Sequence, residues 1–93
     1  MIEVTYDKLE DATKVFGLIG LETRDDIKKR YLKLSKIYHP DMQDGNTQKF
    51  QELTQAYKIL LTYMDNFKFR FSKEEFKNQY PFLATEDKQW SLW

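Results

Sequence analysis

The tripeptide His39-Pro40-Asp41 combines the residue types in this chain that could do chemistry. Pro40 has no N–H to donate and disfavours the helical conformation in the residue before it, so a helix must end here. An imidazole and a carboxylate are then left at an exposed turn. Such a pair could take part in catalysis, hold a metal ion, or contact a partner.

Neither an enzyme nor a metal centre is predicted. His39 is the only histidine and the chain has no cysteine, so a transition-metal site would depend on one imidazole and carboxylates alone. The sequence contains no nucleophile elbow and no glycine-rich phosphate loop. We therefore expect a protein that is not an enzyme and that carries no metal or other cofactor.

A basic amphipathic helix is predicted directly before the tripeptide, from about Arg24 to Tyr38. At about 100° per residue, Ile27, Tyr31 and Leu34 fall on one side and the lysines fall on the other. The five cations that follow its acidic first turn are Lys28, Lys29, Arg30, Lys33 and Lys36. They could form a solvated outer face, or a patch that docks an acidic protein surface or phosphates. The neighbouring tripeptide favours the patch.

Length and charge limit the other possibilities. A chain of 93 residues predicts one small domain with one modest core. Lys plus Arg equals Asp plus Glu at 15 each, so nucleic acid is a disfavoured partner. The first 20 residues are acidic where a signal peptide would be basic, and no apolar run is long enough to span a membrane. We expect a cytoplasmic monomer.

Two further helices should frame the basic one. Helical periodicity predicts a first helix from about Asp7 to Phe16, followed by an apolar connection expected to plug the core. That connection contains Leu18, Ile19 and Leu21. A third helix is predicted over about 47–63, with an apolar arc that faces the arc of the basic helix. The two would form an antiparallel hairpin with His39, Pro40 and Asp41 at its tip. The arc consists of Phe50, Leu53, Tyr57, Leu60, Leu61 and Met64.

In the rest of the chain, aromatic and basic residues alternate over 66–71. A short fourth helix is predicted after them, over 73–79, and we expect it to pack on the hairpin. Ser72 and Glu75 have the spacing of a capping box for this helix. The phenylalanines of the alternating segment either cover the open end of the hairpin, which we favour, or form a platform for single-stranded nucleic acid. Trp90 and Trp93, in the aromatic tail 81–93, could pack internally or contact a partner.

These features together resemble the J-domain of the DnaJ co-chaperone family, over about residues 15–61. VFGLIGLETRDDIKKRYLKLSKIYHPD is similar to the end of the family's first helix, its second helix and its His-Pro-Asp loop, and FQELTQAYKIL is similar to its third helix. The resemblance implies an all-α fold and assigns residues 1–80 to the domain. The family's basic fourth helix, glycine/phenylalanine linker, zinc-binding repeats and client-binding β domains have no counterpart here, which speaks for a stand-alone or excised J-domain.

The resemblance also implies a partner and a site. J-domains bind the ATP state of DnaK-type 70-kDa heat-shock chaperones and stimulate their ATP hydrolysis. Carried over by position, the signature would be His39, Pro40 and Asp41. The docking face would be Lys28, Lys29, Lys33 and Lys36, with Arg30 beside them. The alternatives are a J-like scaffold that does not stimulate and a nucleic-acid binder.

Overall fold

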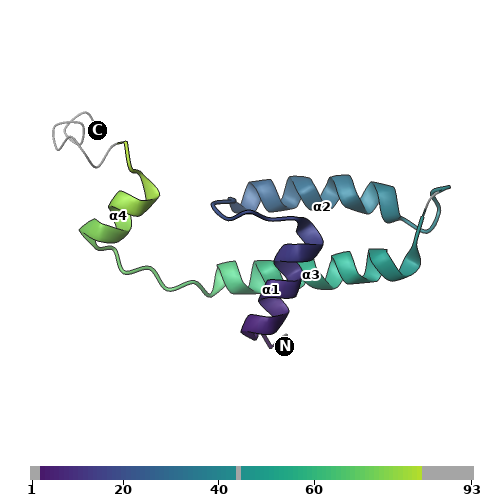
Figure 1. The fold of residues 1–93 in the computed structure, drawn as a ribbon, viewed down its shortest axis with the longest axis horizontal. Coiled ribbons are helices and arrows are strands. Elements are labelled where there is room, and N and C mark those ends of the chain that lie inside the picture. Colours follow the sequence, from purple (N-terminus) through teal and green to yellow (C-terminus); the bar gives the residue numbers. More distant parts are fainter. Residues whose placement is uncertain (1–2, 44, 83–93) are drawn as a thin grey trace.

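The computed structural model describes residues 3–43 and 45–82, and within them the chain is all-α, as the sequence predicted. Its helices are α1 (Tyr6–Phe16), α2 (Arg24–Tyr38), α3 (Thr47–Asp65) and α4 (Lys73–Gln79). Figure 1 shows α2 and α3 as an antiparallel hairpin, with α1 crossing α3. The predicted helices therefore exist with nearly the predicted bounds.

A stack of three aromatic rings joins these three helices. Tyr31 of α2 lies face to face with Tyr57 of α3, with ring centroids 4.2 Å apart and an interplanar angle of 8°. Phe16, at the end of α1, stacks on the same Tyr57 at 6.2 Å. Such pairs add stabilisation beyond the burial of their area. Tyr57 therefore fixes how both α1 and α2 lie on α3.

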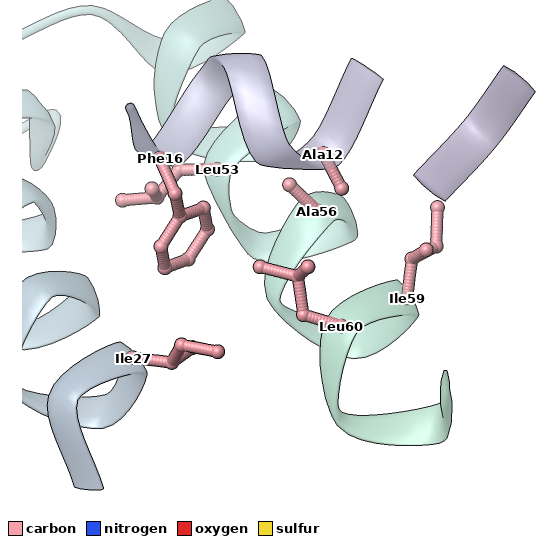
Figure 2. Close-up of a cluster of buried hydrophobic side chains, with 7 residues drawn as sticks. All are labelled: Ala12, Phe16, Ile27, Leu53, Ala56, Ile59 and Leu60. Carbon is pink, nitrogen blue, oxygen red and sulfur yellow. The ribbon is translucent and has the colours of Figure 1, made fainter. Parts of the chain in front are cut away.

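The buried core lies where α1 and α2 meet α3 (Figure 2). Its members are Ala12, Phe16, Ile27, Leu53, Ala56, Ile59 and Leu60. The sequence pattern identified a single arc on α3 and omitted Ala56 and Ile59. The arc is wider than expected because α3 packs against two helices, and a helix with two neighbours must bury more than one stripe.

Polar contacts hold the open end of the hairpin. The Thr23 hydroxyl accepts the backbone N–H of Asp26 while the Asp26 carboxylate accepts that of Thr23, which completes a capping box at the start of α2. The hydrogen bond from the Thr23 backbone N–H holds the pKa of Asp26 below its ordinary value. Arg24 pairs with Asp65, which joins the start of α2 to the end of α3.

The apolar connection after α1 does not plug the core as a whole. Gly17 ends α1 in the left-handed conformation, at φ 65°, and Leu18 then packs against the core. Ile19 and Leu21, by contrast, are 95% and 103% exposed. The core is already closed by Phe16 and Leu18, so two of the three apolar residues in this connection have no internal contact to make.

The fourth helix has the predicted bounds but not the predicted packing. It makes no contact with α1, α2 or α3, and Figure 1 shows it beyond the end of α3. Ser72 caps it by accepting the N–H of Glu75, whereas the Glu75 carboxylate accepts the N–H groups of Arg70 and Phe71 instead of closing the predicted box. None of its residues is buried, and its one aromatic residue, Phe76, contacts Tyr80 at the end of the same helix.

The phenylalanines of 66–71 do not cover the hairpin. Phe67 contacts Tyr63 of α3, and the rings of Phe67, Phe69 and Phe71 follow one another at 5.0 and 6.0 Å. Phe71 is 89% exposed. The rings contact each other rather than the core, which corrects the interpretation favoured from the sequence. Trp90, Trp93 and nearly all of the tail 81–93 lie outside the described residues.

The core assignment predicts a large cost for Leu53→Ala. Leu53 is 0% exposed, and truncating a fully buried leucine typically costs about 2–5 kcal/mol. Denaturant unfolding should therefore show a much lower midpoint. Leu32→Ala makes the same change on the half-exposed side of α2 and should cost about 1 kcal/mol or less. Equal losses in the two variants would contradict this core.

Candidate functional site

A hydrogen-bonded turn presents the His-Pro-Asp tripeptide. We call residues 39–42 the tip. The His39 carbonyl accepts the N–H of Met42 at 2.9 Å, which places Pro40 in the second position of a four-residue turn, where its fixed φ fits. The Asn46 N–H reaches back to the carbonyl of Tyr38 at 3.0 Å. The tip is thus a closed turn at the end of the hairpin, as the sequence predicted.

His39 and Asp41 both reach solvent from this turn. The His39 ring contacts the edge of Phe50 at 5.4 Å, and its Nδ1 accepts the backbone N–H of Asp41. The Asp41 carboxylate lies 3.7 Å from the same Nδ1, which is longer than a hydrogen bond. The carboxylate, 91% exposed, therefore keeps its capacity to accept a hydrogen bond from a partner.

Gly45 allows the loop to close under the tip. A Cβ at this position would lie 2.1 Å from the carbonyl oxygen of His39 and 2.9 Å from that of Met42. Both are backbone atoms and cannot move away as a flexible side chain could. In the sequence, a glycine followed by Asn46 indicates only a turn. This position must lack a side chain because it lies against the backbone of His39, six residues earlier in the chain. No local sequence pattern encodes that contact.

The lysines of α2 face away from the core. We call Lys28, Lys29, Lys33 and Lys36 the lysine stripe, and all are exposed. Lys29 pairs with Asp25 at 3.0 Å on the surface, and the hydrogen bond and charge of Asp25 raise the pKa of Lys29. In the described part of the chain, the other three lysines have no ion pair, so the stripe keeps an outward positive charge.

Arg30 differs from the lysines because it points inward. Its guanidinium donates to the carbonyls of Phe16 and Gly17, at 3.2 and 3.1 Å. These carbonyls belong to the C-terminal end of α1, where the helix dipole favours a cation. Arg30 therefore attaches α1 to α2, and the docking role that the resemblance gave it stays a prediction.

A hollow under the tip is the remaining feature of this end of the hairpin. Tyr31, His39, Met42 and Phe50 line it, with Lys36 at its edge. The tip therefore offers an apolar depression beside its polar groups. Across residues 3–43 and 45–82, acidic residues and His39 nowhere cluster as a metal site would require. None of the helices in those ranges is long and apolar enough to cross a membrane.

Comparison with known proteins identifies this arrangement. The family model described as "DnaJ domain" matches residues 11–65, which is more than half of the chain. The chain belongs to the DnaJ domain family. The match contains the end of α1, all of α2 and α3, and the tip, so the J-domain resemblance inferred from the sequence is confirmed.

The curated relatives of this J-domain include DnaJ chaperones of bacteria. "Chaperone protein DnaJ" of Lysinibacillus sphaericus is 48% identical over 52 residues, and the proteins of the same name from Staphylococcus saprophyticus and Staphylococcus epidermidis are 44% identical over 52 residues. In each case the match covers 54% of this chain and 14% of the relative. No solved structure gives a significant match.

Gly45→Ala should disturb the tip and leave the helices folded. The added methyl would overlap the His39 carbonyl, so the turn must open, while the core between α1, α2 and α3 lies elsewhere. We expect the amide resonances of His39, Asp41 and Met42 to move and the helical circular dichroism to persist. Gln43→Ala, in the same exposed loop, is the control. An unmoved tip in Gly45→Ala would contradict the contact described here.

Proposed function

We propose that this chain is a co-chaperone that binds the ATP state of a DnaK-type 70-kDa heat-shock chaperone and stimulates its ATP hydrolysis. The observation that carries the proposal is that the lysine stripe runs along the exposed side of α2 toward the His-Pro-Asp tip of a J-domain hairpin. Because the chain spans 14% of the length of the relatives it matches, their activity enters here only as support for this proposal.

The lysine stripe would act first, during encounter. Positive charge on an exposed helix face attracts an acidic surface, which raises the association rate and sets the orientation of docking more than it adds affinity. Lys28, Lys33 and Lys36 are suited to this because no intramolecular ion pair neutralises them in the described residues. Such steering weakens as salt increases, since exposed charges are screened.

The tip would then make the specific contact. The Asp41 carboxylate is positioned to accept a charge-assisted hydrogen bond from a cationic side chain of the chaperone. Pro40 and the bonds that close the loop hold the turn before binding, so little ordering cost remains. Contact with the ATP state in preference to the ADP state would couple docking to the nucleotide. The chaperone itself would supply every catalytic group, and this chain would need no cofactor.

His39→Gln should remove stimulation without unfolding the domain. The imidazole is 49% exposed and makes one ring contact, with Phe50, so melting should change little. Single-turnover ATP hydrolysis by a DnaK-type chaperone should return to its unstimulated rate, whereas Lys77→Gln on α4 should stimulate like the wild type. Full stimulation by His39→Gln would overturn the proposal. Binding by the wild type without stimulation would instead indicate a scaffold.

A further inference from the structure

The loop between α1 and α2 holds two apolar side chains in solvent. Ile19 and Leu21 are the most exposed large apolar residues in the described part of the chain, at 95% and 103%. They are separated by Gly20 alone and lie just before the start of α2. We call Ile19, Gly20 and Leu21 the apolar knob. An exposed apolar feature rimmed by charge is typical of an interaction site.

Polar contacts hold the backbone of the knob in place. The Glu22 carboxylate accepts the N–H of Ile19 at 2.9 Å through one oxygen and that of Gly20 at 2.8 Å through the other. Before the knob, Arg30 binds the carbonyls of Phe16 and Gly17, and after it the Thr23 capping box begins α2. The loop is therefore fixed on both sides of the side chains it exposes.

The backbone at Leu21 is also strained. Its φ is 66°, in the left-handed region that glycine occupies without penalty and a leucine does not. Leu21 makes no internal contact that would offset this cost, because its side chain lies wholly in solvent. Phe71 also has a left-handed backbone, at φ 53°, but only at Leu21 does the strained residue lie beside the lysine stripe.

The knob shares a surface with the lysine stripe. Ile19 and Leu21 line an open groove of about 510 Å³ together with the cations Lys29, Arg30 and Lys33 and the acids Glu22 and Asp26. A partner seated in this groove would meet an apolar projection and positive charge together. The lining has three cations against two acids, and both acids already accept backbone N–H groups, so charge complementarity favours an acidic surface that also carries an apolar depression.

We infer that the apolar knob is a second contact of the docking surface, and that it inserts into an apolar depression beside the acidic patch of the same DnaK-type chaperone. The inference rests on the proposed function. With this second contact, the docking surface would run from the tip along the lysine stripe to the start of α2. Since Ile19 and Leu21 are already held outward, their burial costs little ordering and should slow dissociation.

The test is the affinity of the double variant Ile19→Ser, Leu21→Asn for a DnaK-type chaperone held in its ATP state. Asparagine tolerates the left-handed conformation, and both residues are exposed, so circular dichroism and melting should not change. We expect an affinity loss of about tenfold, within the range found when single interface residues are truncated. The salt dependence of binding should stay as in the wild type, because no charge is removed.

Phe71→Ser is the matched control, because Phe71 is also 89% exposed but lies away from the stripe, and it should bind like the wild type. Equal affinity of the double variant and the wild type would overturn the inference and leave the proposed function standing. An equal loss in Phe71→Ser would overturn it too, as would a wild-type dimer that the double variant dissolves. A wild type that does not bind the chaperone would overturn the proposed function and this inference together.

Discussion

The stack of Tyr31 on Tyr57 determines which way α2 faces. With the two rings 4.2 Å apart and nearly parallel, α2 cannot rotate about its own axis without losing the contact. Ile27 is then buried on the same side, one turn earlier along the helix. The opposite side, with the lysine stripe, must face solvent. A single aromatic contact beside the core therefore sets the direction of the positive surface and, at the end of the same helix, the direction of the tip.

The domain concentrates charge locally although its net charge is zero. Acidic residues occupy the first turn of α2, where Asp26 completes the capping box and Asp25 pairs with Lys29. The other lysines of the stripe follow without acidic partners in the described residues. This order satisfies the helix dipole and also leaves an uncompensated positive surface next to the tip. The same arrangement of residues thus serves folding and, on our proposal, recognition.

Periodicity and capping rules predicted the helices, the hairpin and the exposed tip, because these depend on residues close in sequence. They could not predict features that depend on distant contacts. Arg30 resembles the other surface cations in the sequence, whereas the structure shows that it binds the carbonyl of Phe16 at the end of α1. Gly45 indicates only a turn in the sequence, whereas the structure shows that a Cβ there would overlap the His39 carbonyl. Ile19 and Leu21 read as core because apolar residues usually are, and only the closed packing around Phe16 shows that no room remains for them. The limits of the domain at residue 80 stay a prediction.

The most direct test is a titration of isotope-labelled protein with the ATP-bound chaperone, followed residue by residue through amide chemical shifts. The account predicts that the largest changes fall on the tip and the lysine stripe, that they weaken when ADP replaces ATP, and that α4 is unaffected. Changes centred on α4 or on residues 66–71, or changes that are the same with either nucleotide, would contradict it.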